Sequence, residues 1–355
     1  MKYSHGGEKY DKKIDIDFSA NVNPFGMPQS VIDVLMDKNN IGEFTDYPDF
    51  NCTCLRKAIA QKKNVNMDNI LCGNGASDLI YRICFALKPK KVLLASPCFS
   101  EYEKAVNASG GEVCIYDTKE ENGFKIQHDF IGVLEYEKPD MIFLCTPSNP
   151  VGVLTESSIL LKTAAWSEKN NCHFFIDECF NSFVSVQERF SMVPISIKNR
   201  HVHVLDAFTK IYGMAGLRLG FLVSSNSQLL EKASQCGGCW NVSAPAQLAG
   251  TEALMCDDYV EKTREYIFNE KELLKKSLSE CGYKVYDGSA NYILFKSIPE
   301  LYEYMLDRHI LIRQCGNYRG LGNEYYRIAV RKRDENERLI SELKKALEEQ
   351  QWQRL

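Results

Sequence analysis

The chain has 355 residues, of which 45% are hydrophobic and 25% charged, a balance typical of a folded globular protein. Its 43 basic and 47 acidic residues give a formal net charge of −4, which disfavours nucleic acid or an acidic membrane surface as partner. The first 18 residues lack the apolar core of a secretory signal, and no stretch approaches the roughly 20 apolar residues of a membrane-spanning helix. We therefore expect a cytoplasmic protein that acts on a small molecule.

Short apolar runs rich in β-branched residues alternate with helical patterns over the first two thirds of the chain. Apolar spacing of three and four residues predicts helices over 76–88 and 157–169. Strands are predicted over 91–97, 140–147, 172–178, 201–208 and 220–225. Such runs separated by helices predict an α/β fold, in which a mostly parallel sheet is wrapped by helices.

The pattern changes after residue 240. A long helical region over about 245–281 precedes a second, smaller predicted sheet with strands over 291–296, 310–315 and 325–331. Asp334 and Glu337 are three residues apart ahead of an apolar stripe, which predicts that they cap the last helix. No Pro/Gly-rich linker marks the boundary between the two regions.

Fourteen cysteines are present, including the close pairs Cys52 with Cys54 and Cys236 with Cys239. In a chain of this length without a secretory signal we expect reduced thiols. A structural zinc site takes about four ligands, whereas these two pairs lie far apart with no histidine at finger-like spacing. The sequence favours incidental thiols over a redox pair or a metal site, and we expect no metal.

Polar residues follow the predicted strands in settings marked by glycine or proline. The segments are "CGNGASD" (72–78), "SPCFSEY" (96–102), "CTPSNPVG" (145–152), "FIDECF" (175–180) and "FTKIYG" (208–213). In an open parallel sheet the carboxyl ends of the strands line one crevice. We therefore expect these five segments to converge on one ligand.

The chemistry of these segments indicates pyridoxal 5′-phosphate. The glycine turn in "GNGASD" opens a helix and offers N–H groups to a phosphate, to which Thr209 and Arg218 can add donors. Asp177 ends an apolar strand and needs a positive partner, which a pyridinium supplies, and Lys210 supplies an amine for the aldehyde. Each feature alone is more simply a turn, a helix cap or a solvated lysine, so the prediction depends on their joint occurrence at successive strand ends.

The segments "GNGASD", "SNPVG", "FIDECF" and "FTKIYGMAGLRLG" together resemble fold-type I pyridoxal phosphate enzymes of the aspartate aminotransferase superfamily, in the branch that contains histidinol-phosphate aminotransferase. Flanking segments, "SHGGEKY", "IDFSANVNPFGMP", "ANYILF" and "ILIRQCGNYRGLGNEYYRIAVRKRDENERLI", resemble the decarboxylases of this branch that convert L-threonine O-3-phosphate to (R)-1-amino-2-propanol phosphate in cobalamin biosynthesis. The resemblance covers nearly the whole chain. It implies a large cofactor-binding domain over 41–240, a small domain formed by 1–40 and 241–355, and a homodimer with a shared active site.

The resemblance also implies roles for single residues toward the cofactor. Lys210 would condense with the aldehyde and later move a proton, and Asp177 would pair with the ring nitrogen. Asn149 would hydrogen-bond the ring hydroxyl, and Phe99 would stack on the ring. The phosphate group would be held by Gly75, Ala76, Ser77, Thr209 and Arg218, with Tyr47 reaching the phosphate of the neighbouring subunit.

For the substrate, the resemblance implies that Arg327 grips the α-carboxylate with a bidentate fork that lysine cannot reproduce. The candidates for the substrate phosphate are His5, Asn21, Arg313 and Asn317.

Three segments of the chain depart from the family pattern. Phe180 stands where many relatives have a tyrosine that contacts the ring hydroxyl, so Asn149 would make that contact alone. Val151 replaces the threonine of "NPTG", and residues 240–243 read "WNVS" where the family has "WSVN". These changes concern the substrate more than the cofactor.

The reaction depends on which bond at the α-carbon is held perpendicular to the cofactor ring, and composition cannot show this angle. The first alternative is an aminotransferase that acts on histidinol phosphate or a similar phosphorylated amine. The second is a decarboxylase of a related phospho- or phosphono-amino acid. A non-catalytic ligand sensor is disfavoured by Lys210, Asp177 and Arg327 together.

Overall fold

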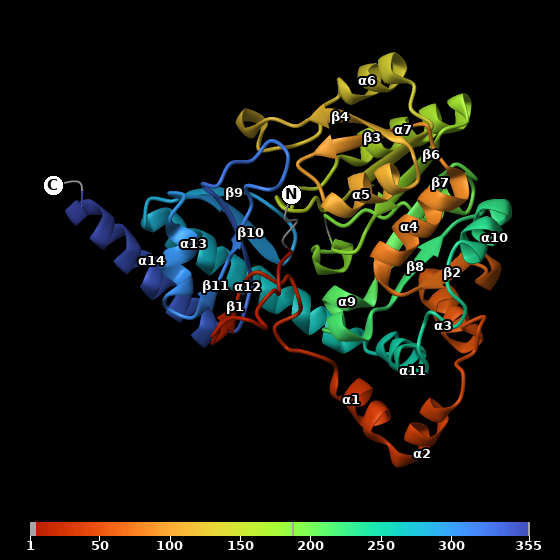
Figure 1. Ribbon diagram of the computed structural model, residues 1–355, viewed down its shortest axis with the longest axis horizontal. Helices are drawn as coiled ribbons and strands as arrows, with labels where there is room; N and C mark the ends of the chain where they lie inside the picture. Colours follow the sequence, from red (N-terminus) through yellow and green to blue (C-terminus); the bar gives the residue numbers. More distant parts are fainter. Residues whose placement is uncertain (1–4, 187, 354–355) are drawn as a thin grey trace.

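The computed structural model describes residues 5–186 and 188–353. Its largest sheet has seven strands in the order β2-β8-β7-β6-β5-β3-β4 (Figure 1). The strands are β2 (Ile70–Gly73), β3 (Lys91–Ser96), β4 (Glu112–Asp117), β5 (Met141–Cys145), β6 (His173–Asp177), β7 (Val202–Ala207) and β8 (Gly220–Val223). Strands β4, β3, β5, β6 and β7 are parallel, whereas β8 runs antiparallel to both of its neighbours. The expected α/β fold with a mostly parallel sheet is confirmed.

Alternate residues of this sheet are buried on opposite faces, as the two-residue period of a strand requires. In β5, Met141 and Phe143 pack with α4 (Gly75–Leu87), α5 (Ser100–Ala108) and α10 (Ser227–Gln235). Ile142 and Leu144 pack on the other side. There the covering helices are α3 (Thr53–Lys63), α6 (Phe130–Glu137), α7 (Ser157–Asn170) and α11 (Ala244–Ala253). Because helices cover both faces, the strands read as continuous apolar runs.

A second sheet of four antiparallel strands has the order β12-β13-β10-β9. The strands are β9 (Lys284–Tyr286), β10 (Tyr292–Lys296), β12 (Arg313–Gln314) and β13 (Tyr325–Ala329). Next to it, β1 (Ile16–Asp17) pairs in parallel with β11 (Ile310–Leu311), so the single strand expected over 310–315 is divided at Ile312. The helices of this region are α12 (Asp257–Glu280), α13 (Leu301–Leu306) and α14 (Arg333–Gln353).

Short elements connect these parts. The N-terminal segment forms α1 (Gln29–Met36) and α2 (Lys38–Ile41), and α1 packs on α11. The remaining elements are η1 (Gly42–Thr45), η2 (Met67–Asn69), η3 (Glu120–Asn122), η4 (Asn181–Phe183), α8 (Val193–Ser196), α9 (Phe208–Ile211) and η5 (Ala215–Leu217). Within the described ranges, no helix is both long and apolar enough to cross a membrane.

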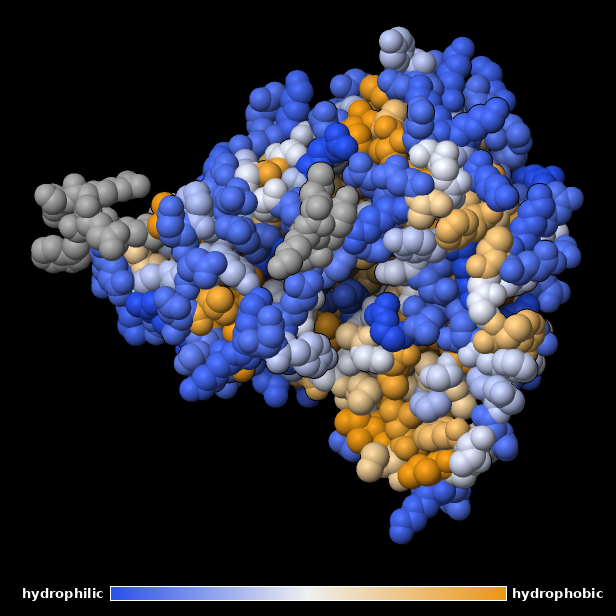
Figure 2. All heavy atoms as spheres, in the orientation of Figure 1, coloured by the Kyte–Doolittle hydropathy of each residue, from blue (hydrophilic) through white to orange (hydrophobic). Residues whose placement is uncertain are grey.

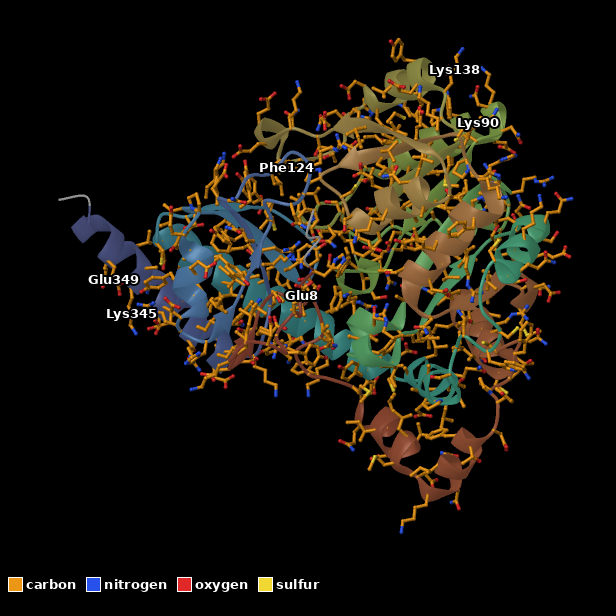
Figure 3. The ribbon with its side chains drawn as sticks, viewed as in Figure 1. Glu8, Lys90, Phe124, Lys138, Lys345 and Glu349 are labelled. Atoms are coloured by element: carbon orange, nitrogen blue, oxygen red, sulfur yellow. The ribbon has the colours of Figure 1, made fainter. Side chains whose placement is uncertain are left out.

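A polar cluster joins the two sheets beside Phe124, which Figure 3 places where their loops meet. Glu120, in η3, accepts hydrogen bonds from Tyr325 (2.8 Å), Lys284 (2.6 Å) and Tyr286 of the smaller sheet. The Phe124 ring packs against the rings of Tyr286 and Tyr325. These contacts fix the position of the smaller sheet against the larger one.

The expected cap of the last helix is wrong. Helix α14 begins at Arg333, so Asp334 already lies in its first turn. Instead, Asn336 Oδ1 accepts from the Arg331 backbone N–H at 3.0 Å, and Glu335 Oε2 accepts from the Lys332 N–H at 3.1 Å. The sequence also did not predict β2 and β4, and none of the fourteen cysteines forms a disulfide in the described chain.

Candidate active site

A cavity of about 650 Å³ lies at the carboxyl ends of β5, β6 and β7, where the N-terminal segment and the smaller sheet meet the larger one. Eleven of the predicted site residues line it: His5, Asn21, Ala76, Ser77, Phe99, Asn149, Asp177, Thr209, Lys210, Arg218 and Arg327. Residues far apart in the sequence therefore converge, as expected for the carboxyl edge of a parallel sheet.

Lys210 lies in α9, directly after β7, and its side chain enters the cavity. Its Nζ makes no hydrogen bond or ion pair with a described residue and lies 6.0 Å from the centroid of the Phe180 ring. Burial, followed by the positive charge of Arg327, lowers the pKa of Lys210 to about 8. At neutral pH, Lys210 is thus neutral far more often than an ordinary lysine, as a nucleophile requires.

Asp177 is the last residue of β6 and is 5% exposed. Its Oδ2 accepts a hydrogen bond from the Tyr102 hydroxyl at 2.6 Å, and its Oδ1 accepts from the Cys179 N–H at 2.9 Å. Burial raises the pKa of Asp177, against the lowering effect of these hydrogen bonds. The carboxylate is held in one orientation and would gain from a positive ring nitrogen.

The first turn of α4 and Arg218 form a cradle for an anion. Gly75 has φ +81°, and a Cβ at this position would lie 2.6 Å from Arg218 Nη2. Only glycine leaves room for the guanidinium so close to the backbone. Thr209 is buried beside the cavity, and Ala76 and Ser77 line it at the amino end of the 13-residue helix. Free N–H groups at such an end favour a phosphate.

Asn149 and Arg327 are in contact across the cavity. Arg327 donates from Nη1 to Asn149 Oδ1 and from Nη2 to the Ser19 carbonyl at 2.8 Å. Asn149 Nδ2 makes no hydrogen bond to a described residue, and the buried Arg327 Nε has no partner among them either. The hydroxyl of Tyr318 lies 3.3 Å from Arg327 Nη1 and 3.5 Å from Asn149 Oδ1. Both the amide and the guanidinium therefore keep donors for a ligand.

These side chains fit pyridoxal 5′-phosphate. The unpaired Lys210 amine matches an aldehyde, the buried Asp177 matches a pyridinium nitrogen, and the Gly75 cradle matches a phosphate. Phe99 supplies an apolar ring, and Asn149 Nδ2 supplies a donor for the ring hydroxyl.

The four candidates for the substrate phosphate do not all lie in this cavity. Arg313 and Asn317 line a neighbouring cavity of about 370 Å³, to which His5 also contributes. Arg313 Nη2 donates to Asn317 Oδ1 at 2.7 Å, and its guanidinium lies 5.4 Å from the centroid of the Tyr318 ring. Asn21 is buried, and its Oδ1 has no partner among the described residues. His5 and Ser19 line both cavities, and Tyr318 of the larger cavity lies against Arg313 of the smaller one.

Tyr47 does not line the cavity of its own chain. Its side chain is 80% exposed, and its ring stacks on Trp240 with centroids 4.3 Å apart. Its predicted reach into a neighbouring subunit stays a prediction.

Sequence reasoning missed Tyr102 and Tyr318. Tyr102 lies three residues after Phe99 in a segment already singled out, and helical spacing could have placed both beside one ligand. Tyr318 lies in the loop between β12 and β13, and nothing in a single sequence shows that this loop reaches Asn149.

Comparison with known proteins agrees with this geometry. Residues 13–343 match the model of the family described as aminotransferase class I and II. A threonine-phosphate decarboxylase from Salmonella typhimurium is 36% identical over 338 residues, covering 94% of this chain and 91% of the relative.

Two solved structures are each 26% identical to this chain, and each match covers 94% of this chain and 99% of the other. A histidinol-phosphate aminotransferase from Clostridium acetobutylicum superposes with a TM-score of 0.87. An L-threonine-O-3-phosphate decarboxylase from Porphyromonas gingivalis superposes with a TM-score of 0.83. The backbone alone therefore does not separate these two activities.

Proposed function

Because the chain belongs to the aminotransferase class I and II family, we propose that it is a pyridoxal phosphate-dependent L-threonine-O-3-phosphate decarboxylase. Its product would be (R)-1-amino-2-propanol phosphate, a precursor of cobalamin side chains. The observation that carries the choice of substrate is the 36% identity, over 94% of the chain, to the Salmonella typhimurium threonine-phosphate decarboxylase.

Bound pyridoxal phosphate would supply an aldehyde that condenses with amines and a ring that accepts the electron pair left at the α-carbon. Lys210 would hold the group between turnovers, and its Nζ would deliver the proton that replaces carbon dioxide. Asp177, fixed by Tyr102, would keep the ring nitrogen protonated. Phe99 and Asn149 would orient the ring, and the Gly75 cradle, with Ala76, Ser77, Thr209 and Arg218, would bind the phosphate.

Arg327 would bind the substrate carboxylate and set its angle to the ring, which selects the bond that breaks. Its guanidinium donates to Asn149 and to the Ser19 carbonyl, which fixes the orientation of the guanidinium. A carboxylate bound to it can therefore take only a small number of orientations. His5, Asn21, Arg313 and Asn317 are proposed for the substrate phosphate, at the junction of the two cavities.

We also propose a homodimer, with the part over 41–240 as the cofactor-binding domain and 1–40 with 241–355 as the smaller one. Figure 2 shows an apolar area over α1 and α11. Large apolar side chains exposed in and near this area are Met36, Ile41, Tyr47, Phe50 and Trp240. Such a surface is typical of a protein interface, and a partner there would bring Tyr47 toward a second active site. A cytoplasmic location stays a prediction of the sequence.

The test is to incubate the cofactor-loaded protein with L-threonine O-3-phosphate, without any 2-oxo acid, and to follow carbon dioxide and aminopropanol phosphate. Multiple turnovers that disappear in Lys210→Ala are expected. Turnover only with histidinol phosphate and 2-oxoglutarate would replace this proposal with the aminotransferase. Sedimentation velocity tests the dimer separately.

A further inference from the structure

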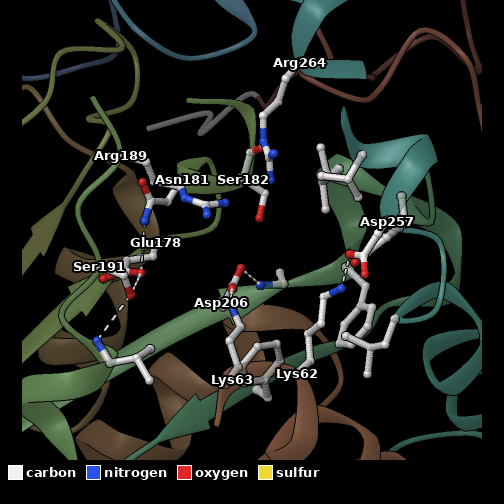
Figure 4. A pocket seen from close by; sticks show the side chains of 18 of the residues that line it. Lys62, Lys63, Glu178, Asn181, Ser182, Arg189, Ser191, Asp206, Asp257 and Arg264 are labelled. Carbon is white, nitrogen blue, oxygen red and sulfur yellow. Dashed lines mark hydrogen bonds and ion pairs between the residues drawn. The ribbon is translucent and has the colours of Figure 1, made fainter. Parts of the chain in front are cut away.

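A third cavity, of about 310 Å³, lies on the other side of β7 and α9 from the candidate active site. We call it the rear cavity. Its polar lining residues are Lys62, Lys63, Glu178, Asn181, Ser182, Arg189, Ser191, Asp206, Asp257 and Arg264 (Figure 4). Among the described residues that line it, Ala207 alone also lines the candidate active site. A ligand in the rear cavity would thus not occupy the proposed cofactor site.

The carboxylates of the rear cavity already have partners. Glu178 accepts hydrogen bonds from the Ser191 hydroxyl (2.7 Å), the Met192 N–H (2.6 Å) and Asn181 Nδ2 (3.1 Å). The two aspartates are paired with lysines, Asp206 with Lys63 at 2.7 Å and Asp257 with Lys62. The two aspartates are therefore each paired with one lysine, whereas Glu178 is held by uncharged donors.

The two arginines of the rear cavity, by contrast, form no ion pair with a carboxylate in the described part of the chain. Arg264 donates from Nε to the Ser182 carbonyl at 2.9 Å, and the Arg189 side chain forms no hydrogen bond or ion pair with a described residue. Burial, and next the positive charge of Arg189, lowers the pKa of Arg264. The guanidinium groups of the exposed Arg189 and the half-buried Arg264 repel each other, and an anion between them would relieve this repulsion.

The rear cavity has further groups, besides the two guanidinium groups, that can contact a ligand. Figure 4 shows Arg189 and Arg264 entering the same side of the cavity, with Ser182 between them. The Ser182 hydroxyl makes no hydrogen bond to a described residue and is a third donor. The apolar part of the lining, which we call the apolar wall, includes Ile211, Leu254 and Val260. A cavity near the lower end of the usual range for small-molecule sites suits a compact ligand.

We propose that the rear cavity binds a small organic anion, whose carboxylate or phosphate is held by Arg189, Arg264 and the Ser182 hydroxyl. Guanidinium forks match both anions, and the apolar wall contacts the remainder of the ligand. Two residues of the rear cavity are close in sequence to residues of the candidate active site: Glu178 follows Asp177, and Asp206 lies four residues before Lys210. The ligand therefore contacts the same chain segments that form the candidate active site, from their other side. This site does not depend on the proposed decarboxylase function.

The test measures binding of phenyl phosphate, and separately of benzoate, to the cofactor-loaded protein by calorimetry. In Arg189→Gln and Arg264→Gln we expect at least tenfold weaker binding. Arg200→Gln is the matched control, since Arg200 is an exposed arginine outside the cavity that contacts Gln228. Arg313→Gln, which alters the neighbouring cavity, should leave this binding unchanged. Comparison of the two probes shows whether phosphate or carboxylate is preferred.

Two results would overturn the proposal: equal affinity in the parent and in both rear-cavity variants, or loss of binding in Arg313→Gln alone. Arg189 is exposed and its side chain bonds to none of the described residues, so its variant should fold even if Arg264→Gln does not. Arg264→Lys, which keeps the charge without the fork, should bind with intermediate affinity. Thermal melts of each variant exclude unfolding as the reason for weaker binding.

Discussion

Arg327, on β13 of the smaller sheet, donates a hydrogen bond to Asn149 Oδ1, in the loop that follows β5 of the larger sheet. The contact occupies the acceptor of the amide and leaves Nδ2 for a ligand. The group proposed to bind the substrate carboxylate and the group proposed to orient the cofactor ring therefore cannot move independently. The Tyr318 hydroxyl lies beside both of them.

Removing the Tyr318 hydroxyl should weaken the coupling between Arg327 and Asn149. In Tyr318→Phe the hydrogen bond to Arg327 is lost, and we expect kcat/KM for L-threonine O-3-phosphate to fall about 5- to 10-fold, equivalent to about 1 kcal/mol. Tyr325→Phe is the control, because that hydroxyl bonds Glu120 away from the cavity. Equal effects of the two substitutions on steady-state kinetics would contradict a role of Tyr318 in the site.

The anion cradle predicts that a methyl group at residue 75 lowers the affinity for the cofactor. Gly75→Ala places a Cβ 2.6 Å from Arg218 Nη2, so the guanidinium must move and cofactor affinity should fall at least tenfold. Gly110→Ala is the control, because Gly110 has a similar φ, +85°, with no atom within 4 Å of the added Cβ. Both variants should lose about 1 kcal/mol of stability from the left-handed backbone, whereas only Gly75→Ala should bind cofactor weakly in equilibrium titrations.

The lowered pKa of Lys210 predicts how cofactor attachment depends on pH. Only the neutral amine attacks an aldehyde, so the rate constant for loading cofactor-free protein should rise with pH and level off above a midpoint near pH 8. Stopped-flow absorbance at a series of pH values measures this midpoint. A rate that continues to rise toward pH 10.5, the ordinary value for lysine, would show that Lys210 is not in the environment described here.

Glu120 predicts an acid-sensitive connection between the sheets. Hydrogen bonds from Lys284 first, then Tyr286 and Tyr325, lower the pKa of Glu120 to about 2. Folding lowers this pKa from the ordinary value of 4.5, so the ionised carboxylate stabilises the folded protein above about pH 4.5. This contribution to the free energy of unfolding is lost as the pH falls toward 2. Because Glu120 is partly exposed, Glu120→Gln should lower the free energy of unfolding by only about 1 kcal/mol at pH 7.

Denaturant unfolding of the parent and Glu120→Gln at pH 7, 4 and 3 measures this difference. The gap between the two proteins should shrink as the pH falls. A constant gap over this range would mean that the charge of Glu120 does not contribute.

The larger sheet and most of the candidate site could be predicted from the sequence for a physical reason. Strands buried on both faces read as continuous apolar runs, and the residues that follow them meet at one edge of the sheet. Lys210, Asp177 and Asn149 are each within a few residues of such a strand end. Their convergence could therefore be predicted from the positions of the strands and from the rule that parallel strands have their carboxyl ends at one edge of the sheet.

Other features depend on tertiary contacts that a single sequence does not show. The sequence did not predict the short strands β2 and β4, because four to six residues with both polar and apolar side chains do not show a clear two-residue period. The cap of α14 uses Asn336 and Glu335, which bond back to backbone groups before the helix instead of following the expected pattern. Arg313, which lines the neighbouring cavity, lies beside Tyr318, which lines the candidate active site, because β12 pairs with β13.

The central claim is that the carboxylate, not the α-hydrogen, leaves the substrate. The most direct measurement incubates the cofactor-loaded protein with L-threonine O-3-phosphate that carries deuterium at the α-carbon and analyses the products by mass spectrometry. We expect aminopropanol phosphate that retains the deuterium, with one carbon dioxide released per product. Loss of the deuterium to water, with a 2-oxo acid phosphate as product and no carbon dioxide, would contradict the claim and identify an aminotransferase.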